Sequence, residues 1–107
     1  MKTQLKLSPK TGFPDRYSVT ACAVVAVLAH HGGEWRCNED TWNLEDEVAD
    51  LLNVTKSARS REVRPNRTAW TVHLDFARTF LVNLSWMQPT TSSGRGVWRL
   101  TEALVEV

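Results

Sequence analysis

The spacing of apolar residues along the chain predicts three helices. Residues 19–30 are apolar at almost every position, so this segment is expected to be the central buried helix, which Gly32 and Gly33 end. In residues 44–52 the apolar positions fall on one stripe and acids occupy the other face, which predicts an amphipathic helix. Residues 68–84 form the third predicted helix. Its buried stripe, at spacings of three and four, consists of Trp70, Leu74, Ala77, Leu81 and Leu84.

Short strands are expected at residues 34–36, 86–89 and 96–101. The last of these alternates between two faces, so one side can cover the core while the other meets solvent or DNA. The turn between the last two strands reads Thr-Thr-Ser-Ser-Gly-Arg and carries Arg95 at its tip. A helix that leads directly into such a hairpin is typical of a winged helix. The predicted fold is therefore α+β, a winged helix with three helices, a small antiparallel sheet and a C-terminal wing hairpin.

The length of 107 residues is enough for one compact domain. Residues 1–17 are polar and contain Pro9, Gly12 and Pro14, so a largely irregular N-terminal arm is expected to drape over the domain or contact a partner. Residues 18–107 are expected to form the domain itself. The longest apolar run is too short to span a membrane and no leader peptide opens the chain. A cytoplasmic protein without a membrane partner is therefore expected.

Charge is distributed unevenly, although the net charge is only +1. Residues 1–55 carry five Lys or Arg and eight Asp or Glu, whereas residues 56–107 carry eight and four. Residues 56–67 hold five cations against one acid and lack apolar periodicity, so a basic loop or irregular strand is expected there. Clustered cations suit contacts with DNA phosphates, and the acidic face of residues 44–52 is expected to turn away from DNA. The alternative is a set of scattered, solvated arginines.

The third predicted helix and its surroundings supply the candidate DNA contacts. Amide groups at a helix N-terminus favour phosphate, so arginines just ahead of residue 68 are placed to hold the DNA backbone. Polar residues on the helix are candidates for contacts in the major groove, while Arg95 either probes the minor groove or phosphate or is an exposed turn residue. The candidate residues are Arg59, Arg61, Arg64, Arg67, Thr68, Thr71, Asp75, Arg95 and Arg99.

The residues that could act in catalysis or bind a metal form no recognisable site in the sequence. Cys22 and Cys37 lack the spacing of a zinc site, and Cys22 is expected to be a small core residue. The acids of residues 44–52 are expected to be solvated helix surface, so no enzymatic activity, cofactor or metal is expected. Trp35 and Trp42 either pack between the first two helices, which is favoured, or support a pocket for a flipped base.

Two segments carry a family resemblance: residues 76–81, Phe-Ala-Arg-Thr-Phe-Leu, and residues 94–102, Gly-Arg-Gly-Val-Trp-Arg-Leu-Thr-Glu. Further matching positions are residues 24–29, residues 44–55 and Trp70. From residue 19 to residue 103 the chain resembles the N-terminal winged-helix domain of Mrr-type modification-dependent restriction enzymes. The resemblance implies a DNA-recognition module that senses base modification and, in larger relatives, delivers a separate nuclease domain to DNA. The chain departs from the family at residues 82–85 and after Glu102.

These observations predict a non-enzymatic winged-helix domain that binds double-stranded DNA. Recognition of modified DNA and guidance of a separate nuclease or other protein subunit are its further expected roles. The alternative is a winged-helix protein–protein interaction module, because a near-neutral total charge and Asp75 on the expected reading face fit a protein partner.

Overall fold

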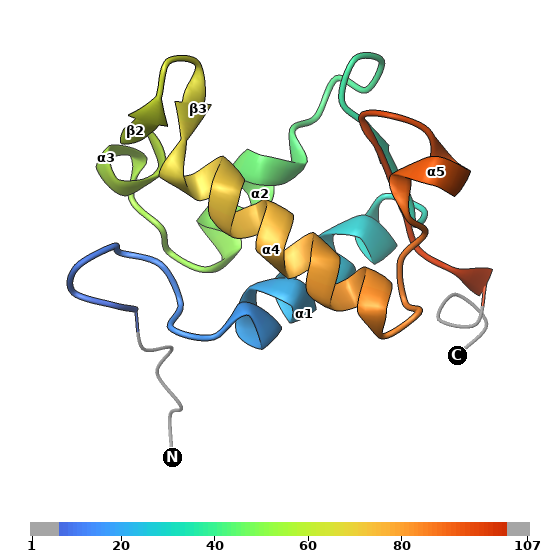
Figure 1. The fold of residues 1–107 in the computed structure, drawn as a ribbon, viewed down its shortest axis with the longest axis horizontal. Coiled ribbons are helices and arrows are strands. Elements are labelled where there is room, and N and C mark those ends of the chain that lie inside the picture. Colours follow the sequence, from blue (N-terminus) through green and yellow to red (C-terminus); the bar gives the residue numbers. More distant parts are fainter. Residues whose placement is uncertain (1–6, 103–107) are drawn as a thin grey trace.

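The structure is a computed structural model that describes residues 7–102, and its elements surround one hydrophobic core (Figure 1). In chain order they are α1 (Tyr17–His30), β1 (Glu34–Arg36), α2 (Leu44–Leu51), α3 (Lys56–Arg59), β2 (Glu62–Arg64), β3 (Arg67–Thr68), α4 (Ala69–Asn83), α5 (Thr90–Ser93) and β4 (Val97–Arg99). The described part is α+β, as predicted, but it has five helices rather than three, and two small antiparallel sheets. None of these helices has the length and apolar character that a membrane span needs.

The two long helices, α1 and α4, pack against each other at the centre of the molecule (Figure 1). α1 is apolar on nearly every side and supplies core residues from Thr20 to Leu28, as the sequence predicts. It ends where Gly33, at φ 91, donates its N–H to the carbonyl of Leu28 at 2.7 Å. Glycine adopts this left-handed conformation without a side-chain clash. Cys22 is exposed on α1, so its expected core position is wrong.

α4 is the predicted third helix, with Thr68 as its N-cap. The Thr68 hydroxyl accepts the amide N–H of Thr71 at 3.2 Å. The predicted buried stripe is confirmed except at its end, where Leu84 is 44% exposed. Leu84 is the C-cap, where the chain leaves the helix and turns through Ser85 at φ 63. Met87, 1% exposed, closes this end of the core instead.

The larger sheet pairs β1 with β4 and so joins the two halves of the chain. Trp35 lies opposite Trp98 in this sheet, both are buried, and their ring centroids are 6.2 Å apart. The strand predicted at residues 86–89 is reduced to a single bridge between Met87 and Leu100. After it, α5 replaces the predicted open turn, because the carbonyl of Pro89 accepts the amides of residues 92 and 93.

Residues 56–67, expected to be an irregular loop, fold into α3 and a small hairpin of β2 and β3. Thr55 caps α3 by accepting the amide of Ala58 at 3.1 Å. The hairpin turns at Pro65 and Asn66, and Asn66 has φ 63. Proline followed by a residue at positive φ is a common sequence for a tight turn. The hairpin was missed because its strands bury little and show no apolar alternation.

The described part of the N-terminal arm, residues 7–16, packs on the domain. Its backbone folds back on itself, since Ser8 donates its amide to the carbonyl of Phe13 and Leu7 bridges Pro14. Phe13 is only 4% exposed and its ring lies 5.1 Å from that of Trp70. This part of the arm therefore contributes to the core and has a fixed place beside α4.

Phe13→Ala is expected to lower the free energy of unfolding by about 3 kcal/mol, because it removes a buried aromatic ring and leaves a cavity. Phe76→Ala is the matched control, since Phe76 is 53% exposed and its loss is expected to cost less than about 1 kcal/mol. Urea denaturation followed by circular dichroism measures both. Equal, small effects of the two changes would contradict a packed N-terminal segment.

Candidate nucleic-acid interface

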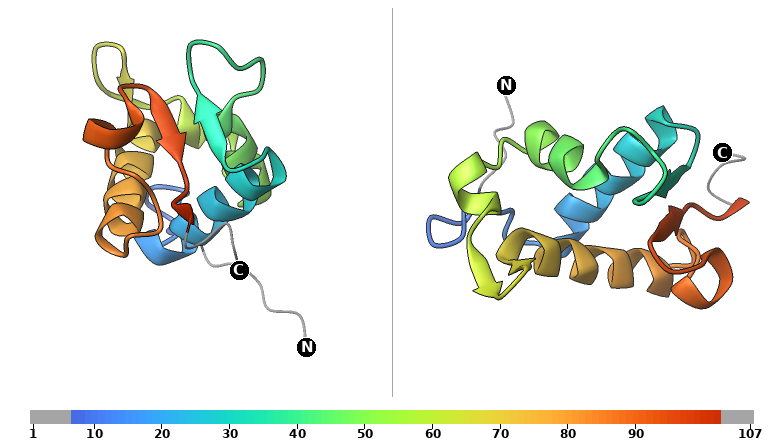
Figure 2. Two further views of the ribbon diagram at one scale, coloured as in Figure 1. Left: turned by 90° about the vertical axis from the view of Figure 1, so that its right-hand side faces the viewer. Right: turned by 90° about the horizontal axis from the view of Figure 1, so that it is seen from above.

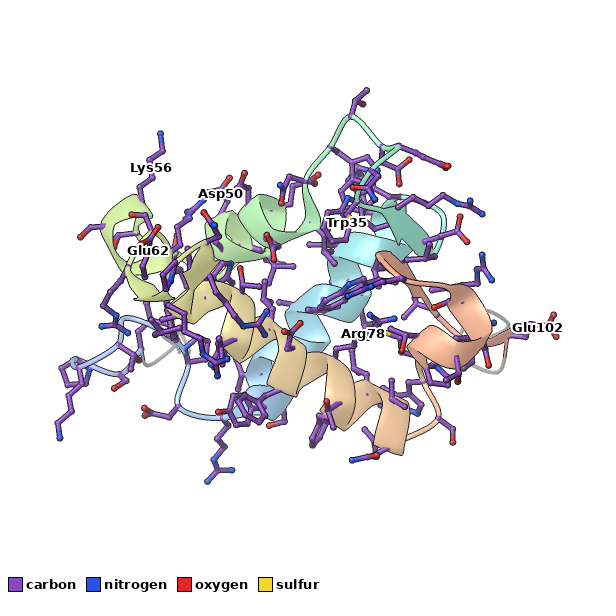
Figure 3. The ribbon with its side chains drawn as sticks, turned by 45° about the horizontal axis from the view of Figure 1, so that its top comes forward. Trp35, Asp50, Lys56, Glu62, Arg78 and Glu102 are labelled. Atoms are coloured by element: carbon purple, nitrogen blue, oxygen red, sulfur yellow. The ribbon has the colours of Figure 1, made fainter. Side chains whose placement is uncertain are left out.

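Four exposed cations gather at the end of the molecule formed by the N-terminal loop, α3 and the β2–β3 hairpin. We call this set, Lys10, Lys56, Arg61 and Arg64, the basic end. Within residues 7–102, none of the four forms an ion pair. Lys56 points away from the body of the protein (Figure 3). A cation that forms no ion pair within the protein can contact phosphate without first losing an acidic partner.

Specific contacts hold the N-terminal loop against α3 and the hairpin. Arg61 donates from Nη1 to the carbonyl of Lys10 at 3.4 Å, and its guanidinium lies 5.9 Å from the ring centroid of Phe13. Gly12, at φ +76, approaches α3 so closely that a Cβ there would lie 3.0 Å from the Cβ of Ala58. Lys10 therefore reaches the basic end from a distant part of the sequence.

The polar candidate residues at the start of α4 form ion pairs and hydrogen bonds with one another. Arg67 forms an ion pair with Asp75, and both side chains are roughly half exposed. Thr68 caps the helix, and its hydroxyl lies 2.9 Å from that of Thr71. The charge of Asp75 on this side of α4 is thus balanced by Arg67.

Arg59 faces the protein rather than solvent. Its Nη2 donates to Asp50 at 2.9 Å and to the carbonyl of Val54 at 2.6 Å, and Nη1 lies 3.5 Å from Asp46. The side chain is 14% exposed. Arg59 holds α3 against α2 in this arrangement and is not part of the exposed candidate surface.

The two candidate residues from the wing differ in their environment. Arg99 forms an ion pair with Glu34 across the β1–β4 sheet and donates to Gln88 at 3.3 Å. Hydrogen bonds from Arg36 and then from Arg99 hold the pKa of Glu34 below its usual value. Arg95 is exposed between α5 and β4 and forms no ion pair with residues 7–102.

The candidate residues do not all converge on one point. Arg61 and Arg64 precede α4, Arg67, Thr68 and Thr71 lie at its N-terminal end, and Asp75 lies near its middle. The wing, with Arg95 and Arg99, lies at the other end of this helix, which is about 22 Å long. The hairpin and the wing nevertheless project toward the same side of α4 (Figures 1 and 2).

An acidic flank adjoins the basic end. A cleft of about 570 Å³ between α2, α3 and the start of α4 is lined by Glu45, Asp46 and Asp50 as well as by Lys56 and Arg59. Figure 3 shows Asp50 on α2 and Lys56 on α3 along the same edge of the molecule. The acids of α2 thus lie next to the basic end, whereas the sequence analysis expected them to face away from DNA.

Glu45 of α2 contacts the first turn of α4. Its Oε2 accepts the hydroxyl of Thr71 at 3.3 Å, and its backbone carbonyl accepts the indole N–H of Trp70 at 2.9 Å. Burial raises the pKa of the Glu45 carboxyl, although the bond from Thr71 opposes this effect. A negative charge held here works against phosphate binding at the N-terminus of α4.

Sequence reasoning missed three cations that the structure makes prominent. Lys10 and Lys56 belong to the basic end but are not among the candidate residues named from the sequence. Arg78 instead joins α4 to the sheet: it donates from Nη2 to the carbonyl of Val97 at 2.8 Å and lies 5.0 Å from the ring centroid of Trp98 (Figure 3). Burial lowers the pKa of Arg78. No spacing in the sequence distinguishes its role from that of an exposed arginine.

The side chains of Trp35 and Trp42 are both held in packing contacts within the domain. The Trp35 indole donates to the carbonyl of Trp42 at 3.0 Å, and the Trp42 ring stacks on His31 at 3.6 Å. His31 also lies 2.9 Å from Glu47 of α2. Trp42 thus packs between the end of α1 and α2, as the favoured interpretation has it, whereas Trp35 packs in the β1–β4 sheet. Residues 7–102 contain no group of three or more His, Cys, Asp or Glu side chains placed to hold a metal ion.

Comparison with known proteins yields no matching family model, no matching curated protein and no matching solved structure.

Glu45→Gln is expected to stabilise the fold at pH 7 and to lose this benefit below about pH 4. Because the folded-state pKa of Glu45 is raised, its ionisation costs stability above that pKa, and the cost is absent below the unfolded value. Glutamine keeps an acceptor for Thr71. Thermal melts at pH 7 and pH 4 measure the effect, with the exposed Glu62→Gln as control. The same gain at both pH values would show that the carboxylate charge is not responsible.

Proposed function

We propose that this chain is a winged-helix domain that binds double-stranded DNA through the basic end and the wing. The basic end is the observation that carries the proposal. Its four exposed cations come from three segments at one end of the molecule and form no ion pair with residues 7–102. Such a set suits the regularly spaced phosphates of a DNA strand. Arg95 supplies a further contact about one helix length away.

The order of the elements supports the winged-helix part of the proposal. A helix, a short strand and a second helix precede the long helix α4, and the chain then forms a bridge at Met87 before it returns as β4. The strand between the first two helices pairs with this returning strand. The α3–β2–β3 segment is inserted between the second helix and α4, and it carries most of the basic end.

The acidic flank limits how strongly this surface can attract DNA. With a net charge of +1, binding depends on local cations rather than on the field of the whole protein. We infer moderate, salt-sensitive binding that follows phosphate position more than base identity. The resemblance to Mrr-type enzymes extends the proposal to modified bases and to a separately encoded nuclease. Titration with matched methylated and unmethylated duplexes tests the first of these roles.

Arg64→Ala is expected to weaken binding to a duplex about fivefold, roughly 1 kcal/mol, and to lower the slope of log affinity against log salt by about one. Arg36→Ala is the matched control, because it removes the same charge from a side chain that is 43% exposed but is paired with Glu34 and Glu39. Fluorescence anisotropy at several salt concentrations measures both variants. Equal losses in the two variants, or an unchanged slope in Arg64→Ala, would contradict the proposal.

A protein-interaction module is the second candidate function. It is favoured by the outer face of α4, where Phe76 is 53% exposed and Phe80 is 38% exposed. A helix that reads DNA bases presents polar groups to the groove, and these two side chains offer none. Retention on heparin that is lost at moderate salt favours DNA, whereas no retention favours a protein partner.

A further inference from the structure

Arg67 differs from the cations of the basic end in having an acidic partner. Its Nη2 donates to Oδ2 of Asp75, near the middle of α4, and the two side chains are 40% and 47% exposed. An ion pair this open to water contributes little to the stability of the fold. Its effect is to restrict the guanidinium of Arg67 to one place beside the first turns of α4.

The guanidinium of Arg67 keeps most of its hydrogen-bonding capacity. Arginine carries several N–H donors in one plane, and within residues 7–102 the side chain of Arg67 hydrogen bonds to Asp75 alone. The remaining donors are available to a ligand from solvent, in an orientation that Asp75 fixes. A side chain that is held before binding loses less conformational entropy on binding than a free one.

Arg64 lies directly opposite Arg67 in the β2–β3 hairpin. Side chains of directly opposite residues project from the same face of a sheet, so the two arginines are neighbours. Arg64 forms no ion pair with residues 7–102, whereas Arg67 is paired with Asp75. A free arginine and a paired arginine therefore lie side by side next to the start of α4.

The charges around Arg67 disfavour phosphate and favour a neutral base edge. Asp75 balances the charge of Arg67, and Glu45 lies close enough for both charges to act on its carboxyl. A phosphate at Arg67 would therefore meet two carboxylates, which repel it. Guanine presents two neutral acceptors, O6 and N7, to the major groove, and they match two N–H groups of a guanidinium. Adenine presents an acceptor beside a donor, so it accepts only one of these N–H groups.

We propose that Arg67, held in place by Asp75, reads guanine in the major groove while Arg64 beside it contacts phosphate. This inference rests on the proposed DNA binding and adds a base preference to it. The two opposite arginines of one hairpin thus have different tasks. Arg64 fixes the position of the protein along the DNA backbone, and Arg67 selects the base.

Selection from a pool of randomised duplexes, followed by base replacement, tests the proposal on the unaltered chain. The bound duplexes are expected to share a guanine. Replacing that guanine by 7-deazaguanine removes the N7 acceptor and keeps base pairing, and it is expected to weaken binding at least about fivefold in fluorescence anisotropy. Selected duplexes without a shared guanine, or equal affinities for the guanine and 7-deazaguanine duplexes, would overturn the proposal.

The double variant Arg67→Ala with Asp75→Ala assigns the base preference to this pair without changing the net charge. It is expected to bind the guanine and 7-deazaguanine duplexes equally, with an unchanged slope of log affinity against log salt. Arg64→Ala is the matched control, since it is expected to keep the guanine preference and to lower the slope by about one. A guanine preference that persists in the double variant would overturn the assignment to Arg67.

Asp75→Ala alone tests whether Asp75 positions Arg67. The variant leaves Arg67 without its partner, so the guanine preference is expected to fall several-fold. Total affinity is expected not to fall, because an acid is removed, whereas damage to the fold would weaken binding to every duplex. An undiminished preference would overturn the role of Asp75. Equal binding of all duplexes by the unaltered chain would overturn this inference alone, and no binding of any duplex would overturn the proposed function as well.

Discussion

The burial of Trp70 is the constraint on which the rest of the structure depends. Its ring is 2% exposed and lies against Phe13 of the N-terminal loop, while its indole N–H is bonded to the carbonyl of Glu45 in α2. One side chain therefore fixes the N-terminal loop and α2 around the first turn of α4. These segments carry or border the basic end, so the placement of its cations follows from a packing requirement of the core.

The position of α4 also separates two chemically different surfaces. Toward the hairpin and the sheet, its charged residues Asp75 and Arg78 are bound to other parts of the protein. Away from the sheet, Phe76 and Phe80 leave an uncharged apolar row. The proposed DNA binding by a near-neutral protein depends on locally concentrated cations, and in this fold α3 and the β2–β3 hairpin, rather than α4, supply most of them.

The sequence predicted those parts of the fold whose side chains are buried at regular intervals. α1, α2 and α4 were located within a few residues because a buried stripe leaves a periodic signal, and the short strand expected at residues 34–36 is β1. α3, the β2–β3 hairpin and α5 were missed. Thr55 caps α3 and Asn66 turns the hairpin, and none of the three elements buries a periodic stripe. The candidate site was predicted in part. A basic run locates cations along the chain, but only the three-dimensional packing shows that Arg59 turns inward to α2 while Lys10 joins the hairpin.

The central claim is that DNA contacts the basic end and the wing rather than the outer face of α4. Titration of isotopically labelled protein with a short duplex, followed by amide chemical shifts, tests this most directly. The account predicts that the largest shifts fall on residues 8–12, 56–68 and 94–97, and that they diminish as salt is added. Shifts concentrated at residues 76–84, or no shifts at low salt, would contradict it.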